Sequence, residues 1–173
     1  NGSYDYWIIK TNAVGNIQWQ KTIGGESIDE LHIIKQTFDG GFIVGGQSSS
    51  NISYEKSENC RGDFDYWILK LNENGLIEWQ RTLGGTGGEY LNDIIQTNDG
   101  NFLIGGFSNS FISVDKTENS KGGFDFWTLK LNPSGETFWQ KTIGGSDADF
   151  LYSVIETTDN HYLLSGSSHS SIS

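Results

Sequence analysis

The sequence repeats itself at a fixed interval of 60 residues, and this period constrains the fold more than any other feature. The segment Phe64–Gly85 (FDYWILKLNENGLIEWQRTLGG) has one copy before it, at Tyr4–Gly25, and one after it, at Phe124–Gly145. All six tryptophans fall at two positions of the repeat. Such a period is the signature of solenoids, propellers and repeat arrays. We therefore divide a single repeat domain, 1–173, into repeat 1 (1–60), repeat 2 (61–120) and repeat 3 (121–173).

Each repeat opens with a hairpin pattern. In repeat 1 we expect a first strand at Asp5–Thr11 and a second at 17–23, where apolar and polar side chains alternate. Between them lies NAVG at 12–15. Its Asn opens a turn through the side chain, and its Gly supplies a positive φ, which predicts a hairpin with a bulge.

A second hairpin pattern follows a Gly-Gly pair and a short acidic linker. Strands are expected at 31–37 and 41–46, joined by a turn that contains Asp39-Gly40. Apolar side chains point to both faces of 41–46, which indicates a strand that is covered on both sides. Each repeat is thus expected to contain four strands followed by a polar loop of about 15 residues, such as Ser48–Asp63.

The expected fold class is all-β, with each repeat a four-stranded antiparallel blade of a β-propeller. A β-solenoid is the alternative, although its coils are usually shorter. Three blades fall below the usual four to eight. We therefore expect the chain to be part of a larger propeller or array, or to complete a ring with other copies of itself. The tryptophans, represented by Trp7 and Trp19, are expected in the core because they lie within strands; sugar stacking by exposed rings is the alternative.

The charge balance excludes two classes of partner. The chain has 22 acidic and 11 basic residues, a formal net charge of −11, and no cluster of Lys and Arg. Binding to nucleic acid or to an anionic membrane surface needs such a cluster.

No apolar run approaches the length of a membrane span, so no membrane insertion is expected. Cys60 is the single cysteine and its counterpart is Ser120, which excludes a disulfide within the chain.

The long polar loop is the candidate binding element. It reads ISYEKSEN at 52–59 and ISVDKTEN at 112–119. A loop displayed once per blade is where a propeller would contact a partner. The alternative is a solvated spacer that links blades, in which Lys56 pairs with Glu58. The predicted binding residues are Lys56, Glu58, Asn59, Lys116, Glu118 and Asn119.

Three acidic residues, Asp29, Glu89 and Asp149, share one repeat position after the Gly-Gly pair and are weak candidates for a Ca²⁺ site. The alternative, which we favour, is that each caps the turn by accepting backbone N–H groups. No other cofactor is expected. Neither a catalytic motif nor a convergent set of histidines is found in the sequence, so no catalytic residue is predicted and an enzyme is not expected.

The strings DYWIIKTNAVGNIQWQKTIGG, IIQTNDGNFLIGGFSNS and ISVDKTENSKGGFDFW resemble the 60-residue propeller-type repeats of large secreted proteins of Bacteroidetes-type bacteria. The resemblance covers the whole chain. It implies secretion or display on the bacterial cell surface as cargo of type IX secretion, the route in which a C-terminal sorting domain directs export. It implies location more than activity, because many such proteins have no assigned function.

The expected function is a non-catalytic, adhesin-like structural or binding module that presents its loops to a protein partner. The partner would be another subunit or further blades of the same chain. The alternative is a lectin-like propeller that binds surface glycans with one site per blade. That alternative needs loop aromatics, namely Tyr54, Phe107 or Phe111, to line a groove with acidic residues nearby.

Overall fold

The computed structural model describes residues 2–171, and within that range the protein is all-β, with twelve strands in antiparallel sheets. The all-β part of the expected fold class is confirmed. Residues 2–171 contain no helix that could span a membrane. The strands are β1 (Tyr6–Thr11), β2 (Ile17–Ile23), β3 (Asp29–Gln36), β4 (Phe42–Ser48), β5 (Asp65–Leu71), β6 (Ile77–Leu83), β7 (Glu89–Gln96), β8 (Phe102–Ser108), β9 (Asp125–Leu131), β10 (Thr137–Ile143), β11 (Asp149–Glu156) and β12 (Tyr162–Ser168).

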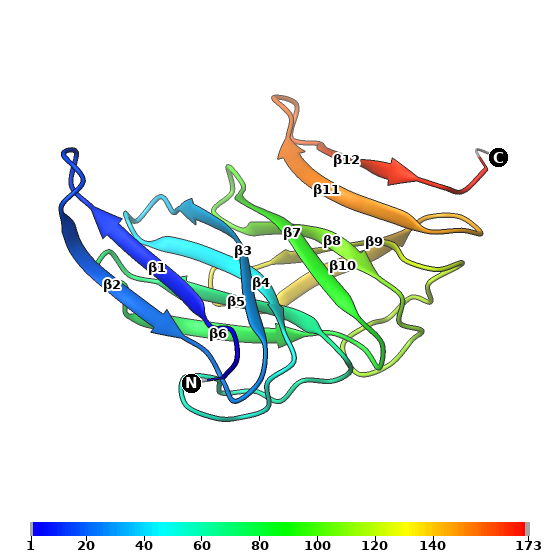
Figure 1. Ribbon diagram of the computed structural model, residues 1–173. Helices are drawn as coiled ribbons and strands as arrows, with labels where there is room; N and C mark the ends of the chain where they lie inside the picture. The colour runs from blue at the N-terminus through cyan, green and yellow to red at the C-terminus, as the bar shows by residue number, and fades with distance from the viewer. Residues whose placement is uncertain (1, 172–173) are drawn as a thin grey trace.

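The sheets are offset from the sequence repeats by two strands. One four-stranded sheet has the order β3-β4-β5-β6, and the next has the order β10-β9-β8-β7. Each therefore combines the second hairpin of one repeat with the first hairpin of the following repeat. The remaining hairpins, β1–β2 and β11–β12, form two-stranded sheets at opposite ends of the stack (Figure 1). The expectation that one repeat forms one sheet is wrong.

The long loops also differ from expectation. Residues 49–64 join β4 to β5, which pair with each other in one sheet from Phe42↔Leu71 to Ser48↔Asp65. The loop of residues 109–124 joins β8 to β9 in the same manner. These loops are therefore connections within a sheet and do not link one sheet to the next. The sheets are linked by the short Gly-Gly segments, such as 24–28 between β2 and β3.

The hairpin turns form as the sequence predicts. The Oδ1 atom of Asn12 accepts the backbone N–H groups of Val14 and Asn16, and Gly15 has a φ of 85°. The register of β1 and β2 shifts at the end of β1, which is the expected bulge. In the second hairpin of repeat 3, Asn160 replaces the glycine and adopts a φ of 61°.

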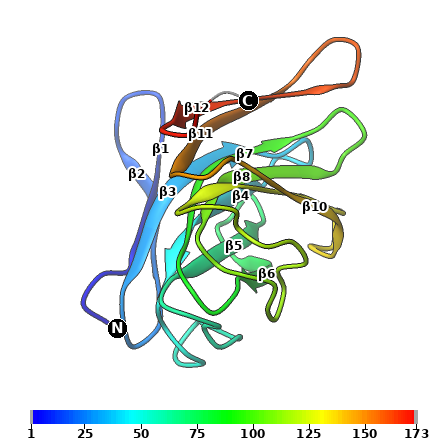
Figure 2. The same ribbon diagram turned by 90° about the vertical axis from the view of Figure 1, so that its right-hand side faces the viewer.

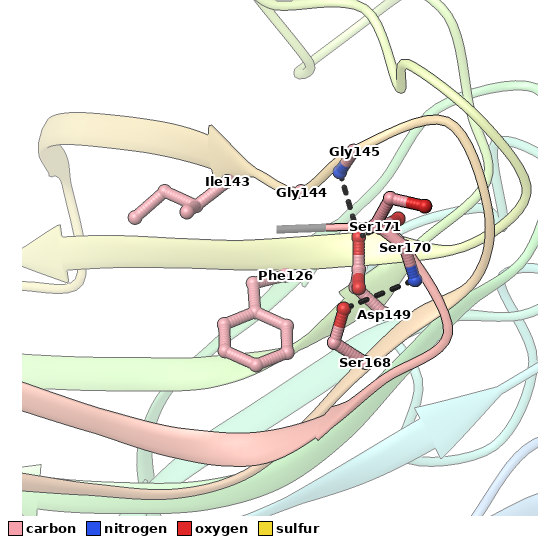
Figure 3. Close-up of a pocket in the computed structure, with 8 residues that line it drawn as sticks. All are labelled: Phe126, Ile143, Gly144, Gly145, Asp149, Ser168, Ser170 and Ser171. Atoms are coloured by element: carbon pink, nitrogen blue, oxygen red, sulfur yellow. Dashed lines mark hydrogen bonds between the residues drawn. The ribbon is translucent and has the colours of Figure 1, made fainter. Parts of the chain in front are cut away.

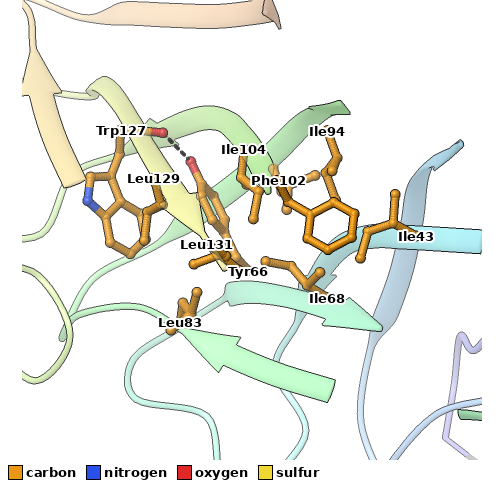
Figure 4. Packing of buried hydrophobic residues seen from close by; sticks show 11 residues of the cluster. Ile43, Tyr66, Ile68, Leu83, Ile94, Phe102, Ile104, Trp127, Leu129 and Leu131 are labelled. Atoms are coloured by element: carbon orange, nitrogen blue, oxygen red, sulfur yellow. Dashed lines mark hydrogen bonds between the residues drawn. The ribbon is translucent and has the colours of Figure 1, made fainter. Parts of the chain in front are cut away.

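The sheets pack face to face through apolar cores. The largest core lies between the two four-stranded sheets, with Ile43, Ile68, Leu91, Ile94 and Trp127 among its buried members (Figure 4). Gly45 of β4 permits this approach, because a Cβ there would come within 2.6 Å of the Cδ1 atom of Ile94. The close packing explains why β4 and β8 are apolar on both faces, as predicted.

Tyrosine hydroxyls add polar links between successive sheets. Tyr6 of β1 donates to the carbonyl of Trp67 at 2.9 Å, and Tyr66 donates to the carbonyl of Trp127 at 3.0 Å (Figure 4). Each tyrosine ring also packs on the indole whose carbonyl it contacts, with ring centroids 4.7 Å apart for Tyr6 and 4.9 Å apart for Tyr66. A single tyrosine side chain thus supplies both an apolar contact and a hydrogen bond between the two sheets.

The tryptophans follow the core prediction with one exception. Trp67 and Trp127 are fully buried, while Trp19, Trp79 and Trp139 are half-buried and pack against apolar clusters. Trp7 is exposed instead. The other tryptophans of this repeat position pack on a tyrosine ring of the preceding sheet and lie beneath a lysine of a long loop, and within residues 2–171 Trp7 has neither neighbour.

Within each four-stranded sheet, the two ends of the strands carry different connections: short turns at one end and a long loop at the other. The pairing of Phe42 with Leu71 places the turns 37–41 and 72–76 at one end. The pairing of Ser48 with Asp65 places loop 49–64 at the other end, which we call the loop face. In Figure 2 this loop, in cyan, lies at the bottom, whereas the turns of β1–β2 and β11–β12 lie at the top.

Removing the hydroxyl of Tyr66 tests the polar link between sheets. The variant Tyr66→Phe keeps the ring but leaves the buried carbonyl of Trp127 without its donor. We expect the free energy of unfolding to fall by about 1–2 kcal/mol in urea titrations. Tyr54→Phe, at an exposed tyrosine, is the matched control and should leave the midpoint unchanged. Equal stability of Tyr66→Phe and the wild type would contradict this role.

Candidate functional site

The two loops of the loop face are folded alike. In the first, the backbone N–H of Lys56 donates to the carbonyl of Ser53 at 2.9 Å, which closes a tight turn with Tyr54 at its tip. Tyr54 has a φ of 49°, and its counterpart Val114 in the second loop has a φ of 47°. Positive φ is uncommon outside glycine and is strained for a β-branched residue. Both loops thus hold their tips in the same costly conformation.

Lys56 lies inside the base of the first loop. Its Nζ donates to the hydroxyl of Thr82 in β6 and, at 3.0 Å, to the backbone carbonyl of Glu58. It also lies 5.1 Å from the centre of the Trp67 ring, a favourable position for a cation. Burial nevertheless disfavours the charged ammonium and lowers the pKa of Lys56 to about 8.

Lys116 makes the same contacts in the second loop. Its Nζ donates to the hydroxyl of Thr142 at 2.6 Å and to the carbonyl of Glu118 at 2.7 Å, and burial lowers its pKa. The carboxylate of Glu118 accepts the backbone N–H of Thr142 and pairs with Lys141, each at 2.7 Å. These partners lower the pKa of Glu118. The second loop is therefore fastened to β10.

Glutamate and asparagine side chains fasten the rest of each loop. The carboxylate of Glu58 accepts the backbone N–H of Thr82 at 2.8 Å and lies 3.6 Å from the guanidinium group of Arg61. The Oδ1 atom of Asn59 accepts the backbone N–H of Ile52 at 2.9 Å, so it closes the loop on itself. Lys56 meets the backbone carbonyl of Glu58, which differs from the expected pairing of the two side chains.

The side chains presented to solvent are those at and near the loop tips. Asn119 accepts the backbone N–H of Ile112 at 2.7 Å, so all six predicted binding residues contribute to holding the loops. Sequence reasoning named Tyr54 only as an aromatic of the lectin-like alternative and missed Val114, because an apolar residue in a polar loop gives no signal of strain. The exposed apolar residues of the two loops are Ile52, Tyr54, Phe111, Ile112 and Val114.

The three candidate calcium ligands act as caps of the Gly-Gly turns, as the favoured alternative predicts. A serine hydroxyl is a second donor to each of them, for example Ser50 to Asp29 at 2.9 Å. The backbone contacts are Gly25 N–H to Asp29 at 2.6 Å, Gly85 N–H to Glu89 at 2.7 Å and Gly145 N–H to Asp149 at 2.7 Å.

A second carboxyl group lies beside each cap. Asp65 and Glu89 are both fully buried, and together they lie against Gly84, where a Cβ would overlap the Asp65 carboxyl group. Burial and the neighbouring Glu89 raise the pKa of Asp65 to about 6. Among residues 2–171, no three acidic, histidine or cysteine side chains are grouped so that they could hold a metal ion. Calcium binding stays a prediction.

Cys60 is part of the loop base. Its Sγ donates to the carbonyl of Ser48 at 3.4 Å, and burial raises its pKa to about 12. Ser120 makes the corresponding contact in the second loop, with its hydroxyl 2.8 Å from the carbonyl of Ser108. A thiol with this pKa is not ionised at neutral pH, which makes it a poor nucleophile.

The aromatics named for a lectin site are not brought together. Tyr54 and Phe111 are exposed, whereas Phe107 packs on Tyr90 and Phe150 with ring centroids 5.3 and 5.0 Å away. Tyr54 and Phe111 also occupy different repeat positions, since their counterparts are Val114 and Asn51. The two described loops therefore do not present the same aromatic side chain.

A groove of about 350 Å³ lies beside β12 at the same end of the molecule. Phe126 and Ile143 form its apolar side, and Asp149 and Ser168 form its polar side (Figure 3). Asp149 there accepts the backbone N–H of Gly145. The groove follows the edge of the hairpin β11–β12, where β12 pairs with no further strand among the described residues 2–171.

Comparison with models of known protein families gives no match, and comparison with curated proteins gives none either. Function is therefore argued from the loop face, the buried polar groups and the edges of the sheets.

Replacing Lys56 tests whether the loop base holds a buried charge. The pKa of Lys56 in the folded protein is below its ordinary value of 10.5, so the unfolded chain binds more protons between about pH 8 and 10.5. Wild-type stability should therefore rise relative to Lys56→Met between pH 7 and pH 10, by on the order of 1–3 kcal/mol. Urea titrations at both pH values measure this difference. Lys35→Met, at an exposed lysine, is the control, and an equal pH dependence of both variants would contradict the buried charge.

Proposed function

We propose that the chain is a non-catalytic binding module, built as blades of a β-propeller, that presents its loop tips to a protein partner. The observation that carries this proposal is the pair of strained, exposed tips at Tyr54 and Val114, held in the same conformation by buried side chains. Strain of this kind persists where the surroundings fix it, and it is concentrated at binding sites.

The arrangement of the first strand of each sheet supports the proposal that the sheets are blades of a propeller. β3, β7 and β11 open successive sheets and lie next to one another. The extra residue in each bulge of β3 and β7 reaches across to the next sheet: the His32 ring contacts the Leu91 carbonyl at 2.8 Å, and the Asn92 amide donates to the Leu151 carbonyl at 2.6 Å. Innermost strands that converge in this way are typical of propeller blades around a central axis.

The chemistry of the polar residues supports a binding role over catalysis. The carboxyl groups of Asp65 and Glu89 are buried beneath the Gly-Gly turn and are used as caps. The Cys60 thiol is protonated at neutral pH because of its raised pKa. An active site needs such groups where a substrate can reach them.

Secretion or surface display, through a type IX route, is proposed on the resemblance of the repeats to those of secreted bacterial proteins.

The lectin-like alternative has less support than binding of a protein partner. A propeller lectin with one site per blade needs the same aromatic at each site, and Tyr54 in the first loop corresponds to Val114 in the second.

The loop tips can be tested by substitution in a capture assay. The immobilised chain is exposed to surface and secreted proteins of the source organism, and bound proteins are quantified. We expect the double variant Tyr54→Ser, Val114→Ser to weaken capture of a specific protein at least about tenfold, as loss of an interface hot spot does.

The matched control is Val14→Ser, an exposed apolar residue in a turn at the opposite end of the strands. Thermal unfolding of all variants checks that the fold is retained. Capture that is unchanged in the double variant, or no specific capture by the wild type, would contradict the proposal.

A further inference from the structure

Two carboxyl groups face each other beside Gly84, in the segment that joins the two four-stranded sheets. A Cβ atom at Gly84 would come within 1.9 Å of the Oδ1 atom of Asp65 and within 2.6 Å of the Oε2 atom of Glu89. Both side chains are fully buried, and they lie within hydrogen-bonding range of each other. Two ionised carboxylates repel each other at such a site, so one of them favours the protonated form.

The two carboxyl groups differ in how their oxygens are bonded. Glu89 accepts three hydrogen bonds of 2.5–2.7 Å, from the backbone N–H of Gly85 and the hydroxyls of Ser108 and Ser110. The Oδ2 atom of Asp65 accepts the backbone N–H of Arg61. Its Oδ1 atom, by contrast, has no hydrogen-bond donor among residues 2–171. A buried oxygen without a partner is costly, and a proton on it turns it into a donor to Glu89.

The same arrangement recurs one repeat further along the chain. A Cβ atom at Gly144 would come within 1.8 Å of the Oδ1 atom of Asp125 and within 2.7 Å of the Oδ2 atom of Asp149. Asp125 is fully buried, and its Oδ1 atom also has no donor in the part of the chain that the structure describes. The close approach persists although an aspartate replaces Glu89, so it belongs to the fold of the Gly-Gly segment.

We propose that Asp65 and Glu89 hold a single proton between them, and that this proton fastens the two long loops of the loop face to each other. Protonated Asp65 donates through Oδ1 to Glu89. Its Oδ2 atom holds Arg61 near the end of the first loop, while Glu89 holds Ser110 near the start of the second. One hydrogen bond thus links the bases of both loops, and it exists only while the proton is bound. This inference concerns how the loops are held and does not depend on what their tips bind.

The surroundings of the pair act on this proton in both directions. Burial and the charge of Glu89 stabilise the protonated form of Asp65 and raise its pKa to about 6. The groups that stabilise the ionised carboxylates instead are the backbone N–H of Arg61, the thiol of Cys60 and the ammonium groups of Lys56 and Lys116. The hydroxyl of Tyr66 faces Glu89 and stays neutral, because burial and that carboxylate raise its pKa.

The link therefore weakens as the pH rises. An aspartate in an unfolded chain has a pKa of about 3.9. Between about pH 4 and pH 6 the folded protein holds the proton while the unfolded chain has lost it. The stability that the proton contributes is thus present in full below about pH 4 and is lost as the pH rises through about 6.

The variant Asp65→Asn tests the shared proton. Its amide has the shape of the carboxylic acid and donates to Glu89 at every pH. In urea titrations, the unfolding equilibrium constant of the wild type should rise relative to that of Asp65→Asn by about 10–30-fold between pH 4.5 and pH 7.5. Asp63→Asn removes an exposed carboxylate from the same loop and is the matched control, which should follow the wild type.

Two NMR measurements complete the test. In the wild type, the carboxyl carbons of Asp65 and Glu89 should report the loss of one proton with a midpoint near pH 6. The amides of Lys56 and Lys116, which close the tip turns, should exchange faster in the wild type than in Asp65→Asn at pH 7.5, and equally at pH 4.5.

Three results would overturn the proposal. The first is an Asp65 carboxyl group that is ionised above pH 4, together with equal pH dependence of the wild type and Asp65→Asn. The second is equal amide exchange of both proteins at pH 7.5, since the proton would then not link the loops. The third is stabilisation of the wild type, but not of Asp65→Asn, by calcium chloride at pH 7.5, because the pair would then hold a metal ion.

Discussion

The pairing of the second hairpin of one repeat with the first hairpin of the next is the interaction on which the rest of the structure depends. β4 pairs with β5, and β8 with β9, each over seven residue pairs. A two-stranded hairpin is marginal on its own, and these ladders make four-stranded sheets from hairpins that the repeat keeps apart. The sheets formed in this way pack on one another, and Ile43 of β4 and Trp67 of β5 are both fully buried between them.

The same pairing explains how the long loops are anchored at both ends. Because loop 49–64 leaves β4 and returns in the neighbouring β5, its two ends are fixed within one sheet. The loop is then anchored to β6 by Lys56 and Glu58. Burying an ammonium group costs free energy unless hydrogen bonds and an aromatic face compensate for lost hydration. Thr82 and Trp67 supply these, and the loop tip is held in a conformation that it would not adopt freely.

Much of the local structure follows from the sequence, while the sheet assignment does not. Asn12 and Gly15 specify their turn by chemistry that acts within four residues, and Asp29 caps its turn over the same distance. A period of 60 residues, by contrast, is unchanged wherever the unit is taken to begin, so it cannot reveal which hairpins share a sheet. The burial of Lys56 depends on Thr82 in another strand, and a charged residue in a polar loop gives no sign of it.

The most direct test of this account is the pairing of β4 with β5 in solution. NMR cross-strand NOEs between the two strands, centred on Val44 and Leu69, would measure it. We expect these contacts, together with their copies between Ile104 and Leu129, and none between β2 and β3. Contacts between β2 and β3 instead would mean that each repeat forms its own sheet, and would contradict the offset on which the fold and the anchoring of the long loops depend.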